Sequence, residues 1–298
     1  MRRIHFIQAK SRLGTPHTPW RSKQSSKGVE LAPGRILSSE FLSQFVIKPS
    51  VTFFSFPDPG QVGQTEYFYT LARALCYFSD TIYSSVSPQE LQVVIGGDHS
   101  VTLGSLMALF KRFNPKDAGY LQIDSHVDLL TYKRSVTKNF HGMFNRVLMD
   151  TFDIPIRDKL VPNKLPTSNV AYIGNFELDK EEKDFLSSKK IFTLTRAQIR
   201  EKRDASLARL KNFISHFHHI HVSFDIDCFD KTFAPATGTP SLSGLYPKNI
   251  FFILHELAKY KNTSVDLVEV TPQRLGARKT IHLARKILFA LLEDFVKK

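Results

Sequence analysis

The sequence predicts an α/β fold in which helices cover both faces of a mostly parallel sheet. Two observations support this prediction: apolar segments of strand length alternate with helical segments, and the apolar segments are continuous instead of alternating with polar residues. A strand that is apolar throughout is typical of a sheet buried on both faces. Because no linker or shift in composition divides the chain, we expect a single domain spanning residues 1–298.

The expected strands are short runs rich in β-branched, aromatic and other apolar residues. The run at residues 51–56, for example, ends at Pro57, which cannot donate a hydrogen bond to a sheet. A shorter run at residues 4–7 precedes a polar stretch rich in Ser, Lys and Pro, so we expect residues 1–27 to be a largely irregular N-terminal segment. In chain order, the expected strands are residues 4–7, 51–56, 91–95, 120–123, 170–173, 191–194, 219–224 and 265–270.

The expected helices place apolar residues three or four positions apart. In residues 66–78, for example, Leu71, Leu75 and Phe78 fall on one face. Residues 196–217 predict one long amphipathic helix between two strands. In chain order, the expected helices are residues 35–37, 66–78, 101–113, 144–149, 196–217, 248–260 and 276–296.

Composition and charge argue against several classes of protein. The chain has 42% hydrophobic residues, no apolar run of membrane-spanning length and no apolar signal-peptide segment, so neither a membrane protein nor an exported one is expected. Cys76 and Cys228 are too few for a disulfide framework or a cysteine zinc site, which favours the cytoplasm. The net charge of +13 raises the question of nucleic acid, but the basic residues are spread along the chain and no nucleic-acid-binding motif is present. We therefore expect no nucleic-acid partner.

Acidic and histidine side chains follow three of the expected strands. Asp225 and Asp227 are two residues apart, which places both carboxylates on one side of an extended chain. Taken alone, such a pair more often caps a helix than binds a metal. In parallel sheets, however, the carboxyl ends of the strands meet at one edge. The residues that would meet there are His99, Asp124, His126, Asp128, Asp225 and Asp227.

This set of candidate ligands contains carboxylates and imidazoles but no thiolate. Oxygen and nitrogen ligands of this kind favour a divalent ion such as Mn²⁺ over structural Zn²⁺. Asp124 and Asp225 could each bridge two ions, an arrangement that activates a water molecule near neutral pH. The sequence therefore predicts a site for two metal ions at the carboxyl edge of the sheet.

Together these motifs resemble the ureohydrolase family, which contains arginases, agmatinases and related guanidino-acid hydrolases. The resemblance runs from about Gly28 to the C-terminus and rests on Gly96-Gly-Asp-His-Ser100, Asp124-Ser-His-Val-Asp128, His141-Gly-Met143, Ser223-Phe-Asp-Ile-Asp227, Ala234-Pro-Ala-Thr-Gly-Thr-Pro240 and Val268-Glu-Val270. It implies a three-layer α/β/α sandwich with two Mn²⁺ ions per subunit. One ion would be held by His99, Asp124, Asp128 and Asp225, and the other by Asp124, His126, Asp225 and Asp227.

The resemblance also implies a mechanism, in which a hydroxide bridging the metals attacks the guanidinium carbon of the substrate. Asp128 would take the proton of that hydroxide and pass it to the leaving amino group. Glu269 matches the glutamate that binds the guanidinium group, and His141 matches a proton shuttle.

The substrate-binding positions resemble arginases more than agmatinases. Asp179 matches an acid that contacts the α-amino group of arginine, a group that agmatine lacks. Thr137 and Asn139 match positions that bind the α-carboxylate, and Thr239 matches another position in the substrate pocket. We therefore expect hydrolysis of L-arginine to L-ornithine and urea. The family also implies a homo-oligomer, commonly a trimer or hexamer.

Several residues depart from the family pattern. Leu130 replaces an asparagine that hydrogen-bonds the substrate carboxylate, and Lys133 and Arg134 add positive charge to the same loop. Ser125 replaces an alanine between two candidate ligands, a small change that we expect to leave the ligands in place. These departures leave open an agmatinase or another guanidino- or formimino-acid hydrolase. A catalytically silent relative that acts as a binding protein is the third alternative.

Overall fold

The computed structural model describes residues 2–15, 26–63, 66–149, 164–174 and 177–297. Within these residues, the centre of the protein is an eight-stranded sheet in which every strand pairs in parallel with its neighbours. The strand order is β2-β1-β3-β8-β7-β4-β5-β6. The strands are β1 (Arg3–Lys10), β2 (Ser50–Ser55), β3 (Glu90–Ile95), β4 (Ala118–Asp124), β5 (Val170–Gly174), β6 (Phe192–Thr195), β7 (His219–Asp225) and β8 (Thr263–Val268).

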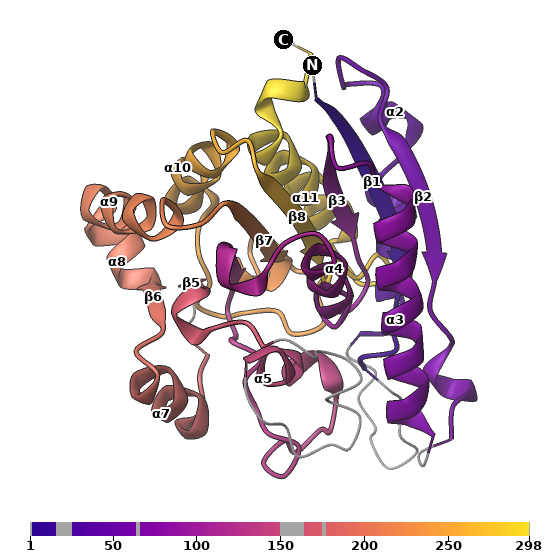
Figure 1. The fold of residues 1–298 in the computed structure, drawn as a ribbon, viewed down its shortest axis with the longest axis horizontal. Coiled ribbons are helices and arrows are strands. Elements are labelled where there is room, and N and C mark those ends of the chain that lie inside the picture. The colour runs from indigo at the N-terminus through magenta and orange to yellow at the C-terminus, as the bar shows by residue number, and fades with distance from the viewer. Residues whose placement is uncertain (1, 16–25, 64–65, 150–163, 175–176, 298) are drawn as a thin grey trace.

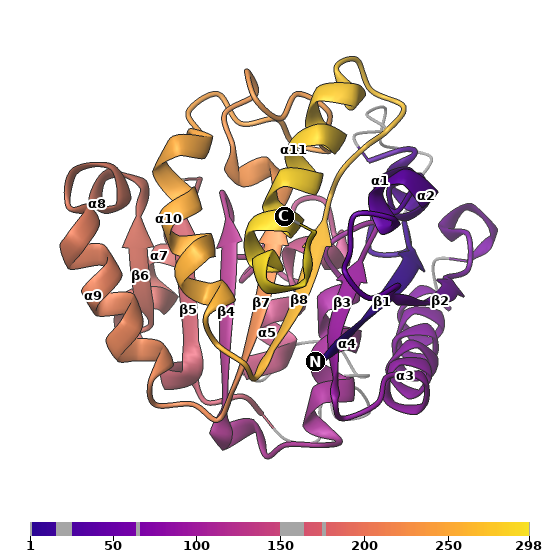
Figure 2. The same cartoon turned by 90° about the horizontal axis from the view of Figure 1, so that it is seen from above.

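Helices cover both faces of this sheet (Figures 1 and 2). One layer contains α1 (Ala32–Ile36), α2 (Ser39–Leu42), α8 (Arg196–Glu201), α9 (Arg203–Ile214), α10 (Pro247–Ala258) and α11 (Ala277–Leu291). The opposite layer contains α3 (Tyr67–Ser85), α4 (Val101–Phe110), α5 (Phe144–Met149) and α7 (Lys180–Ser188). The predicted three-layer α/β/α sandwich with a parallel central sheet is therefore confirmed.

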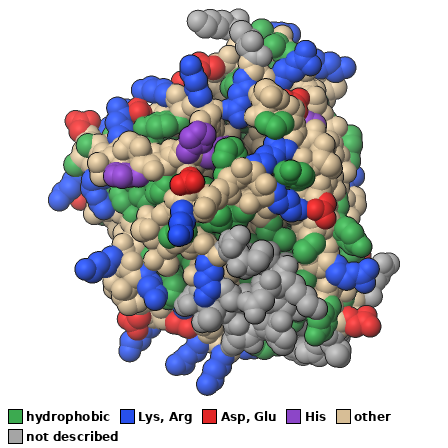
Figure 3. Space-filling model, in the orientation of Figure 1, with side chains coloured by type: hydrophobic (Ala, Val, Ile, Leu, Met, Phe, Trp, Pro, Cys, Tyr) green, Lys and Arg blue, Asp and Glu red, His purple; other side chains and the backbone are tan. Residues whose placement is uncertain are grey.

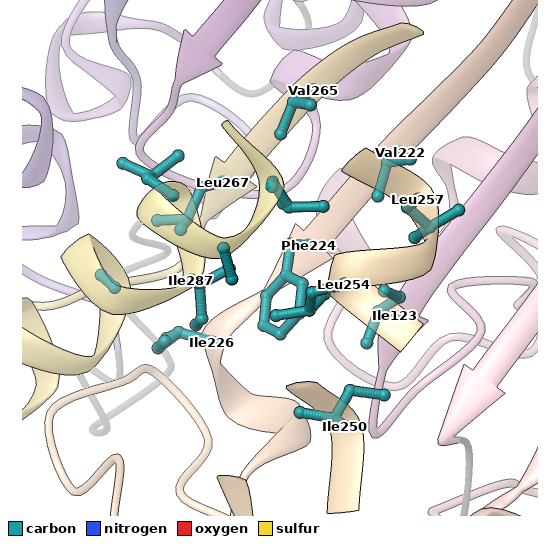
Figure 4. Close-up of a cluster of buried hydrophobic side chains, with 14 of the residues drawn as sticks. Ile123, Val222, Phe224, Ile226, Ile250, Leu254, Leu257, Val265, Leu267 and Ile287 are labelled. Carbon is teal, nitrogen blue, oxygen red and sulfur yellow. The ribbon is translucent and has the colours of Figure 1, made fainter. Parts of the chain in front are cut away.

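The sheet has two hydrophobic cores because successive residues of each strand point to opposite faces. On β7, Val222 and Phe224 contribute to the core under α10 and α11, where Leu254 and Ile287 pack (Figure 4). The other core lies under α3, α4, α5 and α7, where Phe78 of α3 is fully buried. Both faces of the central strands are thus removed from water, as the continuous apolar runs of the sequence predicted.

Several elements differ from their predictions, two of them in ways that change the topology or the extent of the sheet. The single helix expected at residues 196–217 is wrong: the chain leaves helical geometry at Lys202, with φ −131° and ψ 53°, and forms the separate helices α8 and α9. The short strand expected at residues 4–7 is the eight-residue β1, which pairs with both β2 and β3. Residues 3–10 therefore belong to the interior of the sheet and not to an irregular segment. Residues 16–25 of the polar stretch lie outside the described residues.

Positive charge is spread over the face of the protein that Figure 3 shows. Lys and Arg side chains lie scattered across the face in Figure 3 and do not form one continuous stripe. Within the described residues, no helix is long and apolar enough to cross a membrane.

Candidate metal centre

Four adjacent strands bring the predicted site residues to one edge of the sheet. These strands, β3, β8, β7 and β4, are neighbours in the strand order, and all run in the same direction. Asp124 is the last residue of β4 and Asp225 is the last residue of β7. His99 lies between β3 and α4, and Glu269 follows β8 directly. Residues far apart in the sequence therefore meet because their strands end together.

His99 faces three carboxylates. Its Nδ1 atom lies 3.2 Å from Oδ2 of Asp124 and 3.1 Å from Oδ2 of Asp128. The Oδ2 atom of Asp225 is also 3.2 Å away. The other ring nitrogen, Nε2, lies 2.8 Å from the hydroxyl of Ser223. One ring nitrogen is thus held by a neutral hydroxyl while the other points into a cluster of acids.

A second group of ligand atoms lies beside the first. Nδ1 of His126 is 3.1 Å from Oδ2 of Asp227 and 3.6 Å from Oδ1 of Asp124. Asp124 therefore takes part in both groups. The hydroxyl of Ser125 donates to Oδ1 of Asp227 over 2.7 Å and lies 3.1 Å from Nδ1 of His126. Ser125 therefore contacts Asp227 and His126, and these two candidate ligands remain beside each other.

Burial and like charges shift the pKa values of these groups strongly. Burial raises the pKa of Asp225 well above its usual value, and the nearby Asp227 and Asp124 raise it further. Burial also raises the pKa of Asp227, to about 6. Burial opposes protonation of His99, but the nearby carboxylates of Asp124, Asp128 and Asp225 outweigh this effect and raise its pKa well above the usual value. Buried acids crowded in this way favour the presence of a cation.

Two overlapping groups of donor residues could each hold a metal ion. Ligand atoms of His99, Asp124 and Asp128 all lie within 4.8 Å of one another, and so do those of Asp124, His126 and Asp227. Nδ1 of His99 is buried and forms no hydrogen bond within the described residues, although three carboxylate oxygens surround it. An imidazole nitrogen and carboxylate oxygens in this arrangement can hold Mn²⁺ or a similar ion.

Glu269 and His141 form a pair at the same edge. Oε1 of Glu269 lies 2.9 Å from Nδ1 of His141 and accepts a hydrogen bond from the backbone N–H of His99 over 2.9 Å. Glu269 is 4% exposed and its φ is 64°, a conformation that turns the chain sharply away from β8. Asp128 also has a positive φ, 51°. Strained backbone at non-glycine residues often accompanies functional sites.

The residues predicted to bind the substrate tail lie on more exposed loops. Asn139 and His141 belong to one short segment, with Asn139 as the residue before the 3-10 helix Phe140–Gly142. Oδ1 of Asn139 is buried and has no hydrogen-bond partner within the described residues. Thr137, Lys133 and Arg134 are exposed on the same loop.

Asp179 and Thr239 are the other two predicted tail contacts, and both are exposed. Asp179 caps α7: its Oδ1 accepts from the backbone N–H of Glu182 over 3.0 Å, and Oε2 of Glu182 accepts from the N–H of Asp179 over 3.2 Å. Thr239 follows Gly238, where an added Cβ would lie 3.3 Å from Oε2 of Glu269. The loop of Thr239 therefore packs beside Glu269, whereas Asp179 already has a structural role at a helix terminus.

Gln122 was not predicted as part of the site. It is fully buried on β4, and its Nε2 donates to Oδ2 of Asp124 over 2.6 Å and to Oδ2 of Asp128 over 3.1 Å. Its Oε1 accepts from the hydroxyl of Tyr120 over 2.9 Å. A signal existed in the sequence, because Gln122 is a polar residue in an apolar strand and shares a face with Asp124, two residues later.

Asp98, in the segment Gly96–Ser100, is a buried acid that was also not predicted as part of the site. Its Oδ2 accepts from the hydroxyl of Ser11 over 2.7 Å and from the N–H of Gly14 over 3.1 Å, and its Oδ1 accepts from the N–H of Ser100 over 3.0 Å. The backbone N–H of His141 donates in turn to the carbonyl of Gly14 over 3.2 Å. Asp98 thus connects the segment after β1 to the His99 and His141 side of the site.

The fold and the site define an α/β protein with a candidate metal-binding centre at the carboxyl edge of its sheet. A sequence model of the arginase family matches residues 14–293. The chain belongs to the arginase family.

Individual arginases resemble this chain in sequence, and solved arginase structures resemble it in fold. The arginase of Staphylococcus aureus (strain MRSA252) is 32% identical over 197 residues, and that of Eremothecium gossypii is 29% identical over 222 residues. These matches cover 64% and 71% of this chain but only 64% and 54% of the relatives, less than two thirds of their length. The crystal structure of Entamoeba histolytica arginase in complex with L-ornithine superimposes with a TM-score of 0.84 at 24% identity, covering 98% of both chains, which shows the shared fold.

Proposed function

We propose that this protein is a hydrolase with two Mn²⁺ ions that converts L-arginine to L-ornithine and urea. The observation that carries the proposal is the convergence of three carboxylates on the buried, unbonded Nδ1 of His99. Membership of the arginase family and the curated relatives named arginase support the same activity. The ligands would be His99, Asp124, Asp128 and Asp225 for one ion, and Asp124, His126, Asp225 and Asp227 for the other.

The two ions would supply an activated water near neutral pH and would neutralise negative charge that develops during hydrolysis. The protein groups then have separate tasks. Asp128 accepts a proton and passes it to the leaving amino group, because its carboxylate lies among the candidate ligands, 3.1 Å from Nδ1 of His99. The carboxylate of Glu269 orients the planar guanidinium of the substrate. His141, 2.9 Å from Glu269, exchanges protons with solvent at the open side of the site.

The far end of the substrate would contact the exposed loops. Asp179 would bind the α-ammonium group, and Thr137 and Asn139 would bind the α-carboxylate. The unbonded Oδ1 of Asn139 supports a role for its amide in recognition. Thr239, beside Glu269, would line the same pocket. Leu130 cannot donate a hydrogen bond to the substrate, but Lys133 and Arg134 supply positive charge to the same loop. This positive charge supports a substrate that carries a carboxylate at its far end.

A substrate panel tests this proposal. The protein is loaded with Mn²⁺, and urea release is measured for L-arginine, agmatine and guanidinobutyrate, with loss of formiminoglutamate measured in parallel. We expect the highest kcat/KM with L-arginine, and no activity in Asp128→Asn or after chelation of the metal. A preference for agmatine or for a substrate without an α-amino group would contradict the arginase assignment. No turnover of any of these compounds would favour a silent relative.

We further propose that residues 1–298 act as one domain, that the protein is cytoplasmic and that it assembles as a homo-oligomer, a trimer or a hexamer. The continuous eight-stranded sheet, which includes β1 near the N-terminus and β8 near the C-terminus, supports the single domain. Analytical ultracentrifugation of the full chain measures the assembly directly.

A further inference from the structure

A cavity of about 440 Å³ lies at the edge of the sheet opposite to the candidate metal centre. It is lined by residues at the beginnings of the strands, among them Glu90 of β3, His219 of β7 and Ser264 of β8. On β7, His219 at the cavity and Asp225 at the metal centre are the first and last residues of the strand. The two sites are therefore separated by the length of the sheet.

Two arginines, Arg2 and Arg112, line this cavity. Arg2 donates to the backbone carbonyl of Glu90 over 3.0 Å and to that of Lys261. Arg112 donates to the carbonyls of Tyr83, over 2.7 Å, and Val86. These carbonyls carry no net charge, and neither guanidinium forms an ion pair within the described residues. Burial lowers the pKa of both arginines, as expected for cations removed from water without a counter-charge.

The acids near the cavity are already engaged. Glu90 lines the cavity, but its carboxylate is bound by other groups: its Oε2 lies 3.1 Å from Nδ1 of His5 and accepts from the N–H of Ser87 over 2.9 Å. Asp80 pairs with Lys111, a third cation of the cavity lining. The positive charge of the two arginines therefore remains available to a ligand.

A buried amide and a hydroxyl complete the lining. Gln92 lines the cavity and is only 8% exposed, yet its Nε2 has no hydrogen-bond partner within the described residues. A buried donor without an acceptor is costly, so such a group indicates an acceptor that binds there. The hydroxyl of Ser264 lies on the next strand of the sheet.

We propose that this cavity binds a small oxyanion, with a phosphate group held by Arg2, Arg112 and the amide of Gln92. The guanidinium fork matches the oxygen geometry of phosphate, and an amide N–H₂ donates to it without adding charge. The volume of the cavity is sufficient for inorganic phosphate or for a phosphate group on a small metabolite. This proposal does not depend on the reaction at the metal centre.

The experiment is a thermal unfolding titration of the full chain with inorganic phosphate, against chloride at equal ionic strength and without added metal. A ligand that binds only the folded state raises the melting temperature, and we expect a rise of about 2–4 °C at tenfold excess over the dissociation constant. Arg2→Gln and Arg112→Gln should each weaken phosphate binding at least tenfold. Arg203→Gln, which removes an exposed arginine of α9, is the matched control and should leave the rise unchanged.

Three further arms make the outcome decisive. Asp227→Asn should retain the phosphate effect, because its site lies at the other edge of the sheet; loss of the effect would assign phosphate to the metal centre and overturn the proposal. Gln92→Leu tests the cavity without removing a charge and should also weaken binding. Glycerol phosphate in place of phosphate distinguishes a phosphate ester from the free ion. No rise with either compound, or an equal rise in wild type, Arg2→Gln and Arg112→Gln, would also overturn the proposal.

Discussion

The hydroxyl of Ser223 lies 2.8 Å from Nε2 of His99, while Nδ1 of the same ring faces the carboxylates. This contact fixes the orientation of the imidazole, as partners of metal-binding histidines commonly do. Ser223 also lies 3.0 Å from the hydroxyl of Thr102 in α4, which holds the serine in place. The ring orientation is therefore set by the sheet and by the helix that packs on it.

Replacing Ser223 with alanine should weaken metal binding. Without the hydroxyl, His99 can rotate away from Asp124 and Asp128, and we expect the affinity for Mn²⁺ to fall by about 10–100-fold. Competition with a coloured chelator measures this affinity without reference to activity. Ser84→Ala, at an exposed position of α3, is the control. Unchanged Mn²⁺ affinity in Ser223→Ala would show that the ring needs no such support.

Asp227→Asn should separate metal binding from stability. The carboxylate of Asp227 is buried among other acids, and burial raises its pKa to about 6. The neutral amide removes a destabilising charge, so the metal-free variant should be more stable than the wild type by about 1–3 kcal/mol at neutral pH. The same variant should lose most of the rise in melting temperature on Mn²⁺ addition, because one ligand is missing. Asp184→Asn, an exposed acid of α7, should change neither quantity.

The sequence was sufficient to predict the sheet and the convergence of candidate ligands at its carboxyl edge, since continuous apolar strands and strand-end acids follow simple rules. It did not reveal the break at Lys202, because residues 200–204 are all charged and include no glycine or proline that would mark the end of a helix. Gln122 was also missed, because its role depends on contacts with two carboxylates, and one of these, Asp128, lies beyond the end of β4. Contacts of this kind are set by tertiary geometry and not by the spacing of residues along the chain.

His219 should make the stability of the protein sensitive to acid. Burial, followed by the nearby positive charges of His221, Arg2 and His218, lowers its pKa to about 3. The unfolded chain therefore binds a proton below about pH 6.5 that the folded chain does not, and stability falls as the pH drops from that value toward 3. The contribution of His219 is at most about 1.4 kcal/mol per pH unit.

His219→Gln tests this effect, since glutamine retains a polar group near Ser264, which lies 3.0 Å from the imidazole, but cannot be protonated. Urea denaturation is carried out at several pH values in buffer without phosphate. The free energy of unfolding of the variant should fall less steeply than that of the wild type as the pH drops below about 6.5. His282→Gln removes an exposed histidine of α11, and its free energy of unfolding should fall with pH as steeply as that of the wild type. An equally steep fall in the free energy of unfolding of both variants would exclude His219 as a source of the acid sensitivity.

Asp179 combines a helix cap with a proposed contact to the substrate, and the two roles can be separated. Serine caps helices nearly as well as aspartate but carries no charge, so Asp179→Ser should keep the stability of the wild type. Asp179→Ala should lose about 1 kcal/mol because α7 loses its cap. If Asp179 binds the α-ammonium group, kcat/KM for L-arginine should be lower in both variants by about tenfold, because one charge-assisted hydrogen bond is lost. Any activity on agmatine, which has no α-amino group, should be unchanged in both variants. Full arginine activity in Asp179→Ser would mean that the residue acts only as a cap.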